Sequence, residues 1–239
     1  MGTDIHFYVE KLVGDQWVTA DNWFKDEDDG QLSTYKWGPG LKIEAGPMYH
    51  GRNYRLFAML ADVRNGRGFA GVDTGNRINP IHPPRGLPED VCPEVKAASK
   101  NYGIDGHSHS WATVAELMKY DWTQTATLRG WVGPKEFLRW KLGGLPESWS
   151  GGVGGGGIEH VSNEDMEKRL KNDFGTEELE WRHLHALEND LLSAAASYTQ
   201  IEWHIPYSEA ADEFLSQTMP KLWRIGDPDK VRIVFFFDN

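Results

Sequence analysis

This sequence has few cysteines and no long apolar runs, which excludes several classes of protein. Cys92 is the single cysteine among 239 residues, so an intrachain disulfide and a thiolate zinc cage are excluded. The longest apolar runs, LFAMLA and RIVFFF, are far shorter than the roughly 20 residues that span a membrane. No cationic leader precedes an apolar stretch at the N-terminus. We therefore expect a cytoplasmic protein with no membrane partner.

Excess positive charge and the common phosphate-binding motifs are also missing. The chain has 25 Lys and Arg residues against 36 Asp and Glu residues, a net charge of −11. Proteins that bind long nucleic acids present basic surfaces, so we expect no such partner. Neither a GK[ST] phosphate loop nor a GxSxG nucleophile elbow occurs. Any enzymatic activity would need a different set of residues.

One segment reverses the acidic balance of the chain. Residues 50–88 contain no Lys, no Glu and two Asp, and they carry six arginines: Arg52, Arg55, Arg64, Arg67, Arg77 and Arg85. Arginine without lysine suits directed recognition of phosphate or carboxylate, because the planar guanidinium donates in a fixed fork. The alternative is that these arginines pair with the acidic remainder of the chain.

Hydrophobic patterning predicts a single α+β domain over residues 1–239. TDIHFYVEKLV alternates with period two and is followed by Gly14-Asp15 and QWVT, which predicts a β-hairpin. The terminal VRIVFFF is apolar enough for an inner strand. We expect both segments in one antiparallel or mixed sheet, with helices packed mainly on one face. The Gly-rich stretch 150–158 predicts a flexible loop.

Four further segments have helical patterns. They are RNYRLFAMLADV (52–63), ATVAELMKY, which would begin directly after His109 with a capping box at Thr113–Glu116, GPKEFLRWKL, and the stretch 176–200. The last is the strongest prediction, because its apolar residues form one helical stripe: Leu184, Leu187, Leu191, Ala195 and Tyr198.

Histidine and aspartate residues at alternate positions suggest a ligand or metal site. Asp4 and His6 share one face of the predicted first strand, and Asp105, His107 and His109 lie in the predicted loop before a helix. A helix N-terminus beside these histidines would suit an anion. Together, nitrogen and oxygen ligands of this kind suit a divalent Zn, Mn or Fe ion. In the alternative interpretation, Asp105 or Ser110 only caps a local turn and His6 lies on a solvent face.

Several segments together resemble a family of tailed-bacteriophage proteins. These are MGTDIH, RNYRLFAMLADVRNG, PRGLPEDV, GIDGHSHSW followed by TVAEL, and VRIVFFFDN. The resemblance covers both ends and residues 52–118, whereas residues 120–225 match only loosely. Family members typically have Cys where this chain has Thr3, so a thiol role there does not carry over. The matched positions are Asp4, His6, Arg52, Asn53, Tyr54, Arg64, Arg85, Asp105, His107, Trp111 and Asp238.

The resemblance implies a phage accessory protein in the cytoplasm of a bacterial host, where nucleotide-signalled immunity is a common target. Our first hypothesis is an anti-defence or host-takeover protein that captures a small phosphorylated nucleotide-like ligand. The expected ligand-binding residues are Arg52, Asn53, Tyr54, Arg64, Arg85, His107, His109 and Trp111.

Two alternatives remain open. One is a metal-dependent phosphoesterase with Asp4, His6, Asp105, His107 and His109 as candidate ligands. The other is an inhibitor that acts by protein contact or assembles into a homo-oligomer.

Overall fold

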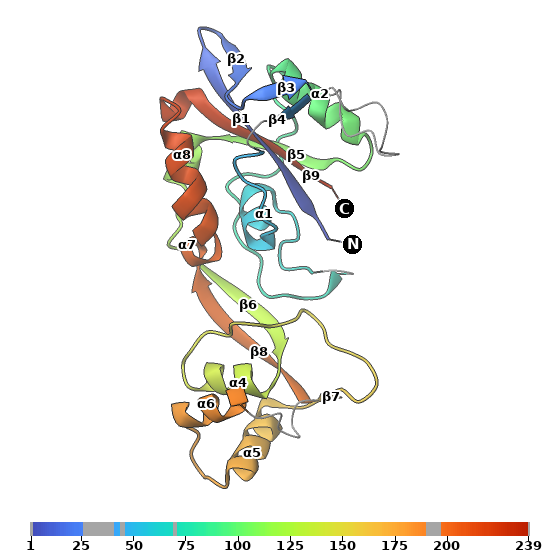
Figure 1. Cartoon of the computed structure of the whole chain (residues 1–239), viewed down its shortest axis with the longest axis vertical. Coiled ribbons are helices and arrows are strands. Elements are labelled where there is room, and N and C mark those ends of the chain that lie inside the picture. Colours follow the sequence, from blue (N-terminus) through green and yellow to red (C-terminus); the bar gives the residue numbers. More distant parts are fainter. Residues whose placement is uncertain (1, 26–40, 44–45, 69–70, 190–196, 239) are drawn as a thin grey trace. The chain divides into compact units, whose positions relative to one another are not determined.

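The computed structural model describes residues 2–25, 41–43, 46–68, 71–189 and 197–238. Its helices and strands confirm the predicted α+β class (Figure 1). Internal contacts divide the chain into two compact units. Unit 1 comprises Met1–Asn65, Ile78–Gln124 and Pro206–Asn239, and unit 2 comprises Gly66–Arg77 and Thr125–Ile205. Within the described ranges, no helix has the length and apolar character needed to cross a membrane.

A four-stranded antiparallel sheet forms the centre of unit 1. Its order is β2-β1-β9-β5, so the terminal strand lies between the N-terminal hairpin and an internal strand (Figure 1). This arrangement confirms the prediction that both ends of the chain share one sheet. The strands are β1 (Asp4–Val13), β2 (Gln16–Thr19), β5 (His107–Thr113) and β9 (Val231–Asp238), and a separate pair consists of β3 (Trp23–Lys25) and β4 (Leu41–Ile43).

Helices pack on both faces of this sheet, not mainly on one face as predicted, because β9 is apolar on both sides. Phe237 packs on Phe57 of α1, whereas Phe236 lies on the opposite face in a core cluster with residues of α2. All residues from Val231 to Phe237 are buried, as expected for a central strand covered on both sides. The helices of unit 1 are α1 (Tyr54–Ala61), α2 (Pro93–Tyr102), α3 (Val114–Lys119), α7 (Tyr207–Ala210), the π-helix η3 (Phe214–Thr218), α8 (Met219–Trp223) and the 3-10 helix η4 (Pro228–Lys230).

A buried clamp ties the sheet to the loop before α2. We define it as Glu10, Trp17, Asp90, Trp111 and Arg232. The Arg232 guanidinium donates through Nε to Glu10 (2.7 Å), through Nη1 to the Asp90 carboxylate (2.8 Å) and through Nη2 to the Asp90 carbonyl (3.3 Å). It also lies 4.0 Å from the centre of the Trp17 ring and 5.6 Å from that of Trp111. Every guanidinium nitrogen is therefore satisfied inside the fold.

Unit 2 contains a three-stranded sheet and three helices. The sheet order is β6-β8-β7, with β7 parallel to β8. Its elements are β6 (Thr125–Val132), α4 (Pro134–Lys141), β7 (Glu159–His160), α5 (Asn163–Phe174), α6 (Trp181–Asn189) and β8 (Ser197–Pro206). The Gly-rich segment 150–158 precedes β7, and its Ser150 pairs with the backbone of Trp131 on β6. Its flexibility stays a prediction.

Two helices have different bounds in the structure from those predicted. The helix predicted over 176–200 is shorter, because α6 ends at Asn189 and Ser197 begins strand β8. Leu184 is buried in α6, whereas Tyr198 belongs to the strand; Leu191 and Ala195 lie outside the described residues. The other helix begins at Val114 rather than directly after His109. The Thr113–Glu116 capping box is confirmed, but the histidine segment before it forms strand β5.

Candidate functional site at the strand ends

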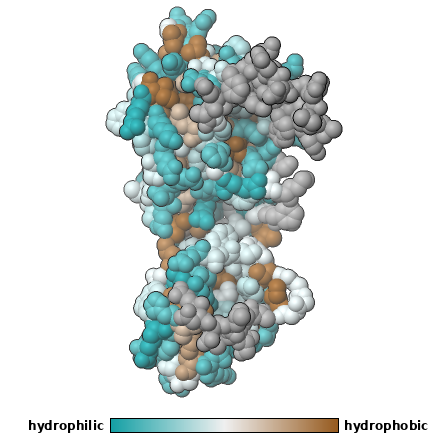
Figure 2. Space-filling model, viewed as in Figure 1, coloured by the Kyte–Doolittle hydropathy of each residue, from teal (hydrophilic) through white to brown (hydrophobic). Residues whose placement is uncertain are grey.

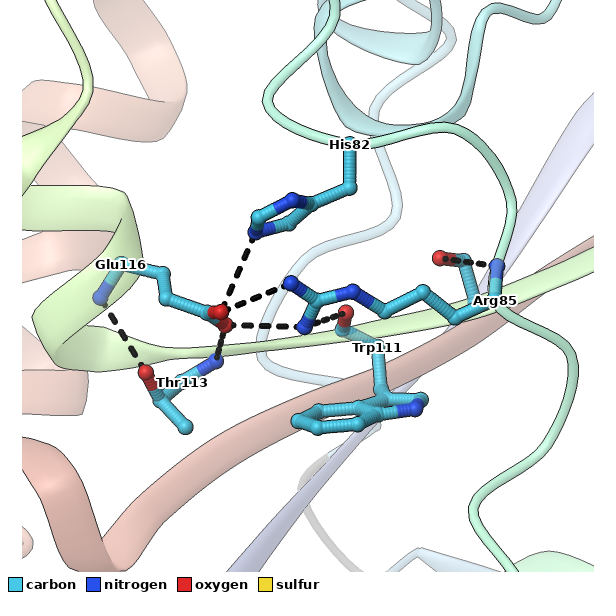
Figure 3. Close-up of polar contacts among 6 residues, drawn as sticks. His82, Arg85, Trp111, Thr113 and Glu116 are labelled. Atoms are coloured by element: carbon cyan, nitrogen blue, oxygen red, sulfur yellow. Dashed lines mark hydrogen bonds and ion pairs between the residues drawn. The ribbon is translucent and has the colours of Figure 1, made fainter.

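Arg85 and Trp111 lie in a network around Glu116 (Figure 3). The Arg85 guanidinium donates to both carboxylate oxygens of Glu116, at 2.7 and 3.0 Å, and His82 Nε2 lies 3.1 Å from Oε1. The backbone N–H of Thr113 also donates to Glu116 at 2.9 Å. Burial acts to raise the pKa of Glu116, but the bonds from Arg85 and Thr113 lower it to about 2. The carboxylate is therefore ionised throughout the neutral range.

This network closes the outer edge of β5. Arg85 lies 4.5 Å from the centre of the Trp111 ring and donates to the Trp111 carbonyl at 3.4 Å. The N–H of Gly86 donates to the His109 carbonyl at 2.9 Å. These contacts satisfy strand carbonyls that would otherwise be exposed at a sheet edge. Both arms of the Arg85 fork are bound by a carboxylate in a largely covered pair, and the Arg85 guanidinium lies over the Trp111 ring, so these contacts give no support to the predicted ligand contacts of Arg85 and Trp111.

A second group of polar side chains gathers where β1 begins, β5 begins and β9 ends. We call it the strand-end cluster and define it as Asp4, His6, Arg52, Tyr102, His107 and Asp238. The register pairs Asp4 with Asp238, His6 with Phe236, and both Ile5 and His107 with Phe237, so these strand ends lie side by side. The N-terminal and C-terminal strands thus bring together residues that are more than 230 positions apart.

Arg52 and Asp4 form a bidentate pair at the surface of this cluster. Arg52 donates through Nε to Oδ1 at 2.8 Å and through Nη2 to Oδ2 at 2.5 Å. The side chains are 52% and 49% exposed, so the pair remains accessible to solvent. The hydrogen bonds from Arg52 lower the pKa of Asp4. Asp4 is consequently charged at neutral pH, and its partner is a surface cation.

His6 lies between a carboxylate and aromatic rings. Its Nε2 atom is 3.4 Å from Asp238 Oδ1, and its ring centre is 4.0 Å from that of Tyr102 and 4.9 Å from that of Phe236. Burial lowers the pKa of His6, although the charge of Asp238 opposes this effect. The imidazole is therefore neutral at pH 7, and each neutral ring has one donor nitrogen and one acceptor nitrogen.

A β-bulge separates His107 from His109. Three residue steps on β5, from His107 to Ser110, oppose two steps on β9, and Ser108 has a left-handed φ of 51°. The extra residue reverses the alternation of side chains. His107 consequently stacks on Phe237, on the α1 side of the sheet, whereas His109 stacks on Phe236 on the other side. The predicted pocket with both imidazoles beside a helix N-terminus is not what the structure contains.

The predicted metal ligands are also kept apart. Phe236 stacks on both His6 and His109, with ring centres 4.9 Å away in each case, and those histidines come from the strands on either side of β9. The Nε2 atom of His109 forms a hydrogen bond with Ser99 Oγ at 2.9 Å. Asp105 is exposed in the turn before β5. In the described part of the chain, no three His, Cys, Asp or Glu side chains are grouped to hold a metal ion.

Two imidazole nitrogens in the strand-end cluster have no hydrogen-bond partner among the described residues. They are the Nε2 atoms of His6 and His107, and both are buried. The two rings lie on opposite faces of the sheet, and His6 Nε2 is 3.4 Å from the Asp238 carboxylate. A buried polar atom without a hydrogen bond costs free energy, so such atoms in a folded protein call for water or a ligand. His107 Nδ1 lies 3.1 Å from Ser108 Oγ, so Nε2 is the nitrogen of that ring without a hydrogen bond.

The remaining predicted residues support the start of β1 and of α1. Asn53 caps α1 by accepting from the N–H groups of Arg55 and Leu56, and it donates to the Ala210 carbonyl at 2.7 Å. Arg64 Nε donates to the Thr3 hydroxyl at 2.9 Å, and the Tyr54 hydroxyl accepts from the Thr3 N–H at 3.2 Å. Asn53 is therefore a structural residue, whereas Arg64 and Tyr54 adjoin the cluster through Thr3.

Sequence reasoning left Tyr102 and Asp238 out of the site. The resemblance matched Asp238, but only the pairing of β1 with β9 shows that it reaches His6. No family model, no curated protein and no solved structure matches the chain. The relation to tailed-phage proteins therefore stays a prediction, and we base the function on the geometry of the cluster.

Proposed function

We propose that this protein captures a small phosphorylated, nucleotide-like ligand at the strand-end cluster. The observation that carries the proposal is the exposed Arg52–Asp4 pair together with the half-buried imidazole of His6, which lies on the same face of β1 as Asp4. In the biological setting that the resemblance implies, the ligand is an immune signalling nucleotide of a bacterial host, and the protein is a phage accessory protein acting in the host cytoplasm.

The residue types fit the phosphate of such a ligand. Guanidinium groups bind phosphate through two parallel N–H bonds, and Arg52 holds this fork at the surface, where Asp4 accepts both bonds. The neutral imidazole of His6, on the same face of β1 as Asp4, can supply one further donor. The net charge of −11 would repel long polyanions in bulk while the local arginine admits a small one.

The alternatives are supported less well by the described residues. A metal-dependent phosphoesterase would need clustered ligands, and the described histidines and carboxylates form no such group. An inhibitor acting through a broad apolar surface would need a contiguous patch. Figure 2 shows small separate apolar areas on the visible face. Among the described residues, the exposed large hydrophobic side chains are scattered along the sequence: Val13, Val72, Ile104, Met118, Leu145, Trp181 and Trp223.

Native mass spectrometry of the purified protein tests capture directly. The protein would be incubated with AMP, ADP, GMP and cyclic dinucleotides, each with its nucleoside as control, and then with a bacterial nucleotide extract. We expect a retained phosphorylated compound in the wild type and its loss in Arg52→Ala and His6→Ala. Arg129→Ala is the matched control, because Arg129 pairs with Asp73 and Glu202 in unit 2.

Three outcomes would contradict the proposal. Retention of nucleoside and nucleotide alike would show that phosphate is not recognised. Phosphate release from a bound nucleotide in the presence of Zn²⁺ or Mn²⁺ would favour the phosphoesterase. Identical native and denatured masses for every probe would favour a protein that acts by contact.

A further inference from the structure

The Asp4 carboxylate already occupies the position that a phosphate would take on Arg52. It accepts from Nε and Nη2 in the two-bond geometry that guanidinium groups offer to phosphate. The Arg52 guanidinium also lies close to Gly2, because a Cβ on that residue would stand only 2.6 Å from Nη1. The bidentate position of Arg52 is therefore filled before any ligand arrives.

We propose that Asp4 is an internal competitor that restricts the site to dianionic phosphate monoesters and excludes monoanionic phosphodiesters. This inference rests on the proposed function, and it specifies the chemical class of the ligand. A diester carries one negative charge, as the carboxylate does, and it gains nothing in charge by replacing Asp4. A terminal monoester carries nearly two charges at neutral pH, and it has three oxygens for the Arg52 fork and the His6 imidazole.

The exposure of the pair makes the exchange feasible. Arg52 and Asp4 are about half exposed, so the carboxylate that leaves the fork is hydrated rather than stranded in the core. Asp238 lies opposite Asp4 in the register and adds a second negative charge to the same end of the sheet. Repulsion from the two carboxylates weakens the binding of every anion at this position. Only a ligand that is attracted more strongly to Arg52 overcomes this repulsion.

Titration of the whole protein with two minimal probes at pH 8 tests this inference. Inorganic phosphate is the dianion, and dimethyl phosphate is the monoanionic diester. The Arg52 Nε–Hε signal in ¹⁵N NMR spectra reports binding at the fork itself. In the wild type we expect this signal to shift with phosphate and to stay unchanged with dimethyl phosphate.

The decisive variant is Asp4→Asn, which removes the charge and keeps the size of the side chain. We expect it to bind phosphate several-fold more tightly, up to about tenfold, and to bind dimethyl phosphate measurably. Asp73→Asn is the matched control, because it removes a carboxylate from a surface arginine in unit 2. That control is expected to leave both titrations unchanged.

The possible failures are distinguishable. If the wild type and Asp4→Asn bind phosphate equally, or if the wild type binds both probes equally, Asp4 does not select the ligand and the inference is wrong while capture at Arg52 stands. If neither protein responds to either probe, the cluster is not a phosphate site, and the proposed function fails with the inference.

Discussion

The strand-end cluster and the buried clamp use the same pair of strands and similar residues, yet they differ in what surrounds them. Both contain an arginine paired with a carboxylate of β1, and Asp4 and Glu10 share one face of that strand. In the clamp, Arg232 is 3% exposed and Glu10 is fully buried. In the cluster, Arg52 and Asp4 are about half exposed, and the nearby His6 imidazole faces the Asp238 carboxylate at 3.4 Å.

The difference shows that an arginine–carboxylate pair has no function by itself. Trp17, Trp111 and the Asp90 loop enclose Arg232, so all of its nitrogens are used to hold the fold together. The Arg52 pair has no such cover in the described contacts, and an incoming anion can compete for it. We therefore expect changes in the clamp to affect stability and changes in the cluster to affect binding.

Glu10→Gln should produce the largest effect on stability. Glutamine keeps the size of the side chain but leaves the buried Arg232 guanidinium without its nearest counter-charge. Removing one partner of a buried ion pair costs about 3–5 kcal/mol of unfolding free energy. Urea unfolding followed by tryptophan fluorescence would measure it, with Glu202→Gln as the control for an exposed pair. A loss below about 1 kcal/mol would show that the clamp is not a stabilising unit.

Glu116→Gln should have an intermediate effect. The change removes an ionised acceptor that serves Arg85 and the Thr113 N–H, and we expect a loss of about 1–2 kcal/mol at pH 7. Because the folded pKa of about 2 lies below the unfolded value, the carboxylate stabilises the fold above pH 4.5. That contribution disappears as the pH falls toward 2.

The pH dependence gives this prediction a second readout. The difference in unfolding free energy between wild type and Glu116→Gln should shrink as the pH falls from about 5 to 2. Glu159→Gln, which alters an exposed pair with Arg169, is a suitable control. A constant difference over this range would mean that the Glu116 charge is not what stabilises the β5 edge.

The sequence predicted the common face of Asp4 and His6, because residues two apart on a strand lie on the same side of the sheet. The register of β1 with β9 confirms it. The bulge at Ser108 could not be predicted, because one non-glycine residue with positive φ leaves no pattern in the composition. That single residue decides that His107 and His109 face opposite sides of the sheet.

The sequence also did not show which arginine pairs with which distant carboxylate. The six arginines of residues 50–88 looked equivalent in sequence, but Arg85 reaches Glu116 and Arg52 reaches Asp4. Helical periodicity also failed over Ser197–Gln200, where the chain enters β8 and the sheet determines the local structure. The candidate site was therefore predicted in part: the residues of the strand ends were named, but their partners and faces were not.

Arg52→Ala should have the smallest effect on stability, and this result separates the two regions most sharply. Exposed ion pairs contribute little to folding because solvent screens them. We expect the urea midpoint of Arg52→Ala to match that of the control Arg129→Ala, while retention of a nucleotide in native mass spectra is lost only in Arg52→Ala. If Arg52→Ala instead destabilises the protein as strongly as Glu10→Gln, then Arg52 is a second clamp. The strand ends would in that case be a structural joint between the first and last strands, and a ligand would have to bind elsewhere.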